Sequence, residues 1–220
     1  MKTPITKDKL QNHFAYSWWK YCLLVVLAAF GWNMIYSMTE YRAPEEKKII
    51  VGVYAYADEA SANAYMEQVR STRLPEMEEM AVTLIAPDQM YGDMILSTRI
   101  AARECDVYIL PREQFQGYAA QGAFMPLEEV LPGLVADLET AQISLSRGKR
   151  AHGETGEKHQ YGIPCAELPG LSQLMQIDAS DMYAAVFFST DNDDNVLIFF
   201  DQFIRDMMVE LADQPDTTAQ

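Results

Sequence analysis

The run IIVGVYAY, residues Ile49–Tyr56, places β-branched and aromatic side chains at both odd and even positions. Because successive side chains of a strand point to opposite faces, this pattern predicts a strand that is buried on both sides. Asp58 follows the run and is suited to cap a helix over residues 60–71, ASANAYMEQVRS. The apolar stripe of that helix, at helical spacing, is Ala62, Tyr65, Met66 and Val69.

Two further units repeat this order of strand and helix, at intervals of about 25–30 residues. Met80–Ile85 is a strand, and Asp88 then precedes a helix over residues 89–104. The expected apolar face of this helix is Met90, Met94, Ile95, Thr98 and Ala101. Asp106–Leu110 is the third strand, and a helix over residues 112–122 follows Pro111. Such alternation favours right-handed crossovers and a parallel sheet covered by helices.

The second half of the chain completes the sheet and ends in a helix. Tyr161–Cys165, YGIPC, and Tyr183–Ser189, YAAVFFS, are the fourth and fifth strand candidates, and residues 148–160 read as an exposed polar loop. A strongly amphipathic helix is expected over Asn195–Leu211. The predicted fold class is therefore α/β, with a mostly parallel sheet of about five strands and helices on both faces.

Before this domain lies an uncharged run of eighteen residues, Tyr21–Met38, flanked by Trp18 and Trp19. As a helix it would cover about 27 Å, close to the hydrocarbon thickness of a bilayer. Aromatic rings near both ends suit the headgroup level. A buried helix of a soluble protein and a cleaved signal are the alternatives. Since no small-x-small cleavage site follows the run, we expect a permanent single-pass anchor.

These segments divide the chain into a short cytoplasmic lead (1–17), a transmembrane helix (18–38), a linker (39–48), an α/β domain (49–212) and a disordered tail (213–220). Lys and Arg are slightly more numerous before the apolar run than after it. The positive-inside rule therefore places the N-terminus in the cytoplasm and the domain in the extracytoplasmic space.

Charge excludes one class of partner. The net charge is −15, and residues 1–42 carry five basic residues against two acidic ones, which leaves −18 for the remainder. A domain this acidic repels nucleic acid. The chain has three cysteines, too few for a disulfide framework. Cys105 precedes its strand and Cys165 ends its own, so parallel strands would keep the two sulfur atoms apart and unbonded.

The segment CDVYILPREQFQGYAAQGAFMPLEEVLP, residues 105–132, resembles the extracellular (type 2 periplasmic-like) solute-binding proteins of ABC importers. YGIPC is similar to the segment where such proteins cross between their two lobes, and residues 177–204 are similar to the return segment. Only about 18 residues separate YGIPC from the fifth strand, too few for a second lobe. The resemblance therefore implies a single truncated lobe, without the second lobe that such proteins close over a ligand.

Ligands of open parallel sheets bind at the carboxyl ends of the strands. In this chain those ends offer aromatic faces, acids and one base as candidate ligand-binding residues: Tyr56, Asp58, Asp88, Tyr91, Arg112 and Glu113. Tyr and acidic side chains suit sugars or cationic ligands, whereas Arg112 suits a carboxylate. The alternative is that Asp58 and Asp88 are ordinary helix caps and that Arg112 and Glu113 are a solvated first turn.

Other groupings are weaker. The histidines and acids of residues 152–159 match no metal-ligand spacing, so we expect a solvated loop and no metal. DNDDN, residues 191–195, lacks the glycine and glutamate of a calcium loop and is better explained as a cap of the last helix. Cys165, His159 and Glu167 are the one nucleophile-like grouping, but nothing places the imidazole against the thiol. No Gly-rich phosphate loop and no cofactor site are expected.

Two functions follow from the sequence. The first is a non-enzymatic ligand-binding domain, anchored in the lipid bilayer through Trp18–Met38, that recognises a small molecule or passes it to an ABC transporter. The second is a protein-interaction module of a membrane complex that binds no small molecule. An enzyme is the least favoured class.

Overall fold

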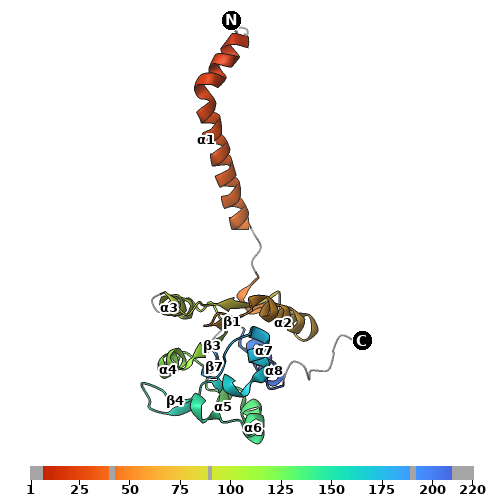
Figure 1. Cartoon of the computed structure of the whole chain (residues 1–220), viewed down its shortest axis with the longest axis vertical. Coiled ribbons are helices and arrows are strands. Elements are labelled where there is room, and N and C mark those ends of the chain that lie inside the picture. Colours follow the sequence, from red (N-terminus) through yellow and green to blue (C-terminus); the bar gives the residue numbers. More distant parts are fainter. Residues whose placement is uncertain (1–6, 40–42, 89–90, 189–191, 210–220) are drawn as a thin grey trace. The chain divides into compact units, whose positions relative to one another are not determined.

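The computed structural model describes residues 7–39, 43–88, 91–188 and 192–209, with side chains from Trp18 onward. The chain forms two units, Met1–Arg42 and Ala43–Gln220. The first contains one long helix, α1 (Lys7–Thr39), and the second is the α/β domain (Figure 1). The expected disordered tail, 213–220, lies outside the described residues.

Helix α1 contains a segment, Trp18–Thr39, that is long and apolar enough to cross a membrane. None of its side chains from Trp18 to Thr39 is buried in the part of the chain that the structure describes. Leu24, Val26 and Phe30 each expose more than 60% of their surface.

One five-stranded sheet organises the domain, with the strand order β2-β1-β3-β7-β6. β1 runs parallel to β2 and β3, whereas β7 runs antiparallel to both β3 and β6. Four strands therefore share one direction, which confirms the mostly parallel sheet, and the fifth predicted strand is the reversed one. The strands are β1 (Lys48–Val53), β2 (Glu79–Leu84), β3 (Val107–Pro111), β6 (Ile163–Pro164) and β7 (Met182–Val186).

Helices cover both faces of this sheet, as predicted from the apolar strands (Figure 1). Alternate residues of each central strand enter two separate cores: Val107 and Ile109 of β3 enter one, and Tyr108 and Leu110 enter the other. The larger core lies under α2 (Glu59–Thr72), α5 (Leu127–Val130), α6 (Pro132–Thr140), α7 (Pro169–Met175) and α8 (Asp193–Met207). The smaller core lies under α3 (Gly92–Ala102) and α4 (Arg112–Ala120).

The predicted stripes of α2 and α8 are confirmed in the described residues. Ala62, Tyr65, Met66 and Val69 are the buried residues of α2. The expected inward residues of α8 are buried at helical spacing, whereas Ile198 is 57% exposed; the buried residues are Val196, Phe199, Phe200, Phe203, Ile204 and Met207. The predicted end of this helix at Leu211 lies outside the described residues. Asn192 stands at the N-cap position, but its side chain makes no capping hydrogen bond; its amide nitrogen lies 3.4 Å from the carbonyl oxygen of Lys48.

Two local predictions are wrong. Leu96 is the buried large side chain of α3, and the expected inward residues Met94 and Ile95 are exposed by 57% and 38%. The loop 148–160 contains a short hairpin, β4 (Lys149–Ala151) with β5 (Lys158–Gln160). Glu128 of α5 organises this hairpin, since its carboxylate accepts from the backbone N–H of Gln160 at 2.9 Å and contacts Nδ1 of His159 at 3.0 Å.

The remaining short elements are the 3-10 turns η1 (Glu45–Lys47), η2 (Leu145–Gly148) and η3 (Cys165–Glu167). Cys105 lies in the smaller core and Cys165 in the larger one, and both thiols are free. The sheet itself therefore separates the two sulfur atoms, in addition to their positions at opposite strand ends.

Candidate functional site

The carboxyl ends of β1, β2 and β3 meet at one edge of the sheet and enclose a surface cavity of about 390 Å³. We call this cavity the edge cleft. Because β7 is antiparallel, its first residues reach the same edge. The lining residues are Tyr54, Ala55, Tyr56, Pro87, Pro111, Gln176, Ile177, Asp178, Ser180, Asp181 and Met182.

Tyr54 and Tyr56 provide two different aromatic surfaces at the end of β1. Tyr54 is buried, and its hydroxyl donates to a carboxylate oxygen of Asp93 at 3.0 Å. Burial, together with Asp93, raises the pKa of Tyr54 to about 12. Tyr54 thus remains a neutral hydrogen-bond donor. Tyr56 is 72% exposed and offers its ring to a ligand in the cleft.

Asp178 and Asp181 supply the negative charge of the edge cleft. The carboxylate of Asp178 accepts from the backbone N–H of Ser180 at 3.0 Å, and the hydrogen bonds from Ser180 lower the pKa of Asp178. Asp181 forms an ion pair with Arg112. An exposed tyrosine ring beside ionised carboxylates can stack on a sugar or a cation and accept its hydrogen bonds.

The six residues selected from the sequence do not converge on this cleft. Tyr56 lines it. Asp58 is an N-cap, as the alternative interpretation held, and accepts from the backbone N–H groups of Ala60 and Ser61 at 3.2 and 3.3 Å. Arg112 lines a neighbouring cleft, described below.

The other three lie beside the edge cleft. Asp88 and Glu113 are exposed, and their charges add to the field that raises the pKa of Tyr54. Asp88 is not the N-cap of α3, because that helix begins at Gly92 and Tyr91 holds the N-cap position. Tyr91 is 58% exposed and lies outside the residues that line the cleft.

The residues expected from the sequence did not include the segment between α7 and β7, which contributes Gln176, Asp178 and Asp181. They all follow strands that were expected to share one direction, whereas an antiparallel strand presents its beginning at the same edge. The short separation of YGIPC from the fifth strand was the available signal. If the chain leaves one strand and begins the next at the same edge of the sheet, the two neighbouring strands must be antiparallel.

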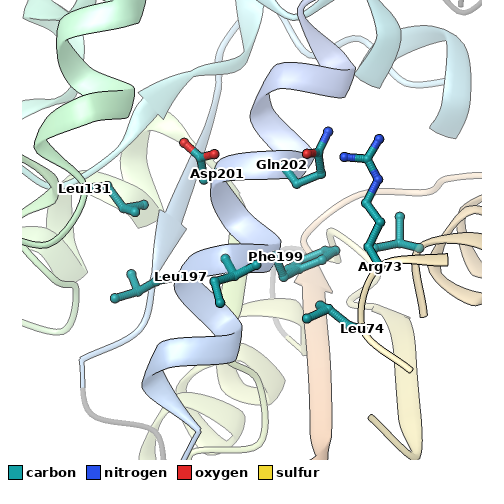
Figure 2. A pocket seen from close by; sticks show the side chains of 9 residues that line it. Arg73, Leu74, Leu131, Leu197, Phe199, Asp201 and Gln202 are labelled. Atoms are coloured by element: carbon teal, nitrogen blue, oxygen red, sulfur yellow. The ribbon is translucent and has the colours of Figure 1, made fainter. Parts of the chain in front are cut away.

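A second cavity, of about 330 Å³, lies between α8, the end of α2 and the α5–α6 junction (Figure 2). Figure 2 shows Arg73, Asp201 and Gln202 along one side of it and leucines along the other. Its polar groups already have partners, since Asp201 pairs with Arg205 at 3.0 Å and Gln202 donates to Asp206. The cavity therefore offers an apolar surface and few uncommitted groups to orient a ligand.

The nucleophile-like grouping at Cys165 is not assembled. Cys165 is fully buried, and burial raises the pKa of its thiol far above the ordinary value, which suppresses the reactive thiolate. His159 instead contacts Glu128. Within the described residues, no group of three or more His, Cys, Asp or Glu side chains is placed to hold a metal ion.

Comparison with known proteins gives similarity in structure alone. No family model matches the chain, and no curated protein matches it. An extracellular solute-binding protein family 1 from Alicyclobacillus acidocaldarius is similar at a TM-score of 0.40 and 20% identity, over 53% of this chain and 27% of that one. The substrate-binding protein Lmo0181 of Listeria monocytogenes, solved with cycloalternan, is similar at a TM-score of 0.38 and 18% identity, over 52% and 28%. This chain thus spans about a quarter of the length of either structure.

Proposed function

We propose that this chain is a membrane-anchored, non-enzymatic ligand-binding domain that holds a small molecule at the edge cleft. The observation that carries the proposal is the cleft itself. It lies where open α/β sheets bind ligands, and it combines an exposed tyrosine ring with the carboxylate of Asp178 and with Asp181, which is paired with Arg112. Its ligand is a sugar or a small cation, because Arg112, the group suited to a carboxylate ligand, is engaged by Asp181.

Anchoring and orientation are part of the same proposal. Trp18–Met38 spans the bilayer, residues 1–17 remain in the cytoplasm, and residues 49–212 form the extracytoplasmic domain behind the linker 39–48. The exposed apolar side chains of α1 and the basic residues before it support this arrangement. The resemblance of residues 105–132 to solute-binding proteins makes an ABC-type transport system the proposed partner.

Thermal denaturation of the full chain in a zwitterionic detergent tests this function against panels of sugars, amino acids and polyamines. We expect a member of the sugar or polyamine panel to raise the melting temperature, since a ligand at 100 times its Kd adds about 2.7 kcal/mol. Tyr56→Ala and Asp178→Asn should abolish the shift. Tyr91→Ala is the matched control, because it removes another exposed tyrosine that lies outside the cleft.

One observation favours the second function, a protein-interaction module of a membrane complex. Tyr91, Met94 and Ile95 form an exposed apolar face at the start of α3. Exposed apolar surfaces of this kind often mark contacts with other proteins. If no panel shifts the melting temperature, and if Met94→Gln with Ile95→Gln releases a membrane protein that co-purifies with the chain, the second function replaces the first.

A further inference from the structure

Beside the edge cleft lies a separate surface cavity of about 250 Å³, lined by Arg112, Gln116, Arg147, Arg150 and Tyr183. We call it the arginine cleft. Its residues come from three stretches of the chain: the helix α4, the continuous segment of η2 and β4, and the strand β7. The fold therefore brings Arg112 to the side of Arg147 and Arg150, which are already close in sequence.

This gathering is unusual for such an acidic domain. The chain has seventeen basic residues, and five lie in residues 1–42, so twelve remain against thirty acidic residues. With acids in such excess, each arginine could have an acidic neighbour. Arg112 has one, since it pairs with Asp181. Among the residues that the structure describes, Arg147 and Arg150 form no ion pair with a carboxylate.

The floor of the arginine cleft is rigid and offers further polar groups. The ring of Tyr183 is buried and stacks on Phe115 with a centroid distance of 4.7 Å and an interplanar angle of 5°. The Tyr183 side chain lies beside the guanidinium of Arg112 and contributes to the raised pKa of that group. Nη1 of Arg150 donates to the carbonyl oxygen of Lys149 at 2.7 Å, which restrains that side chain. Gln116 adds an amide at the wall of the cleft.

Neighbouring like charges repel one another, and the repulsion is relieved when an anion binds between them. Guanidinium groups match the oxygens of phosphate in pairs of parallel hydrogen bonds. We propose that the arginine cleft binds a phosphate group, with Arg147 and Arg150 as its principal ligands and Arg112, held by Asp181, at its border. The ion pair between Arg112 and Asp181 joins this site to the edge cleft, but the proposal does not rest on the function proposed above.

The test is titration of the full chain with inorganic phosphate in zwitterionic detergent, followed by ³¹P NMR line broadening and calorimetry. We expect saturable binding that weakens at least tenfold in the double variant Arg147→Gln/Arg150→Gln. The double variant Arg147→Lys/Arg150→Lys should bind phosphate more tightly than the glutamine variant, because lysine keeps the positive charge. It should bind more weakly than the wild type, because lysine cannot form the two parallel hydrogen bonds of arginine. Melting by circular dichroism verifies that each variant is folded.

The matched control is Lys149→Gln/Lys158→Gln, which removes two positive charges from the same hairpin outside the cleft. It should change phosphate affinity by less than twofold. If Lys149→Gln/Lys158→Gln lowers phosphate affinity as much as Arg147→Gln/Arg150→Gln does, the proposal is overturned, because phosphate would then respond to diffuse surface charge. Absence of phosphate binding by the folded wild-type chain at millimolar concentrations, in detergent and in nanodiscs alike, would also overturn it.

The phosphate could come from a soluble molecule or from a lipid headgroup, and nanodiscs distinguish the two sources. If the headgroup is the natural ligand, nanodiscs that contain phosphatidic acid should weaken the binding of inorganic phosphate at least fivefold relative to phosphatidylcholine nanodiscs. The arginine pair should be required for this competition. Equal affinity in both kinds of nanodisc assigns the site to a soluble phosphate.

Discussion

Asp106 shows how the environment of one carboxyl group makes the stability of the domain depend on pH. It precedes β3, and its carboxylate accepts from the backbone N–H of Ile50 at 2.8 Å. Burial nevertheless outweighs this hydrogen bond and raises the pKa of Asp106 to about 6. The folded state therefore holds this proton more tightly than the unfolded chain, whose Asp pKa is about 3.9. Asp106 stabilises the fold below about pH 4, and that contribution is lost as the pH rises through 6.

Asp106→Asn removes the charge and keeps an acceptor for the N–H of Ile50. We expect the variant to match the wild type at pH 4 and to exceed it by about 1–3 kcal/mol at pH 7. Urea unfolding of residues 43–220, followed by circular dichroism at both pH values, measures the difference. Glu139→Gln, at an exposed position of α6, is the control. An equal gain at both pH values would contradict the assignment of the shift to Asp106.

Gly162 is a close-approach site just before β6. A Cβ atom there would lie 2.6 Å from the ring of Phe115, which is itself stacked on Tyr183. Gly162→Ala should therefore destabilise the domain by about 1–3 kcal/mol. Gly117→Ala is the matched control in the middle of α4, where a Cβ atom meets nothing within 4 Å. That substitution should stabilise the domain by about 0.5–1 kcal/mol, because alanine favours the helix. If the two substitutions changed the unfolding free energy by similar amounts, the side chains around Gly162 would be able to move and accommodate a Cβ atom.

Helix α3 demonstrates the limit of reading a helical face from apolar spacing. Met94 and Ile95 are as apolar as Leu96, so the sequence gives no reason to prefer Leu96 as the inward residue. The rotation of the helix about its axis is set by contacts at its N-terminus. Gly92 packs so closely there that a Cβ atom on it would lie 2.6 Å from the carbonyl oxygen of Ala86 and from the hydroxyl of Tyr54. This close approach orients α3 and leaves Met94 and Ile95 outward.

Substitutions at two adjacent residues of α3 should distinguish the observed orientation, with Leu96 inward, from the expected one, with Met94 and Ile95 inward. Leu96→Ala removes a fully buried side chain and should cost about 2–5 kcal/mol of unfolding free energy. Ile95→Ala, one residue earlier, should change stability by less than about 0.5 kcal/mol. Urea unfolding with a common slope gives both values. The reverse order would restore the face predicted from the sequence.

At the scale of the whole molecule, the chain combines two units with opposite requirements. The α/β domain buries its apolar strands in two cores of its own, whereas α1 exposes apolar side chains along its length from Trp18. Such a helix is stable in lipid, where its backbone hydrogen bonds are satisfied internally and its side chains meet a matching solvent. The two units should therefore behave independently when separated.

Residues 43–220 should be soluble and should unfold cooperatively without detergent, because their cores are self-contained. The full chain should instead sediment with membranes, resist extraction at high salt and high pH, and dissolve only in detergent. Fractionation and circular dichroism check both statements. A full chain that remains dissolved without detergent would refute the anchor, and a fragment that unfolds without α1 would refute the independence of the domain.

The candidate site was less predictable than the fold. Tyr56 could be selected because it follows a strand whose direction is defined by the alternation of strands and helices. Asp178 and Asp181 could not, because their place at the same edge depends on the reversal of β7. The arginine cleft could not be predicted either, since Arg112 reaches Arg147 and Arg150 only when α4 packs against the segment of η2 and β4.

Local patterns of side chains were enough to predict the apolar helix, the five strands of the sheet, and the buried stripes of α2 and α8. Each of these depends on a local period of side chains, which a single segment carries within itself. Tertiary packing sets the direction of β7, the rotation of α3 and the approach of Arg112 to Arg147 and Arg150. Those features depend on contacts between segments far apart in the chain, and no local pattern encodes which segment will be the neighbour.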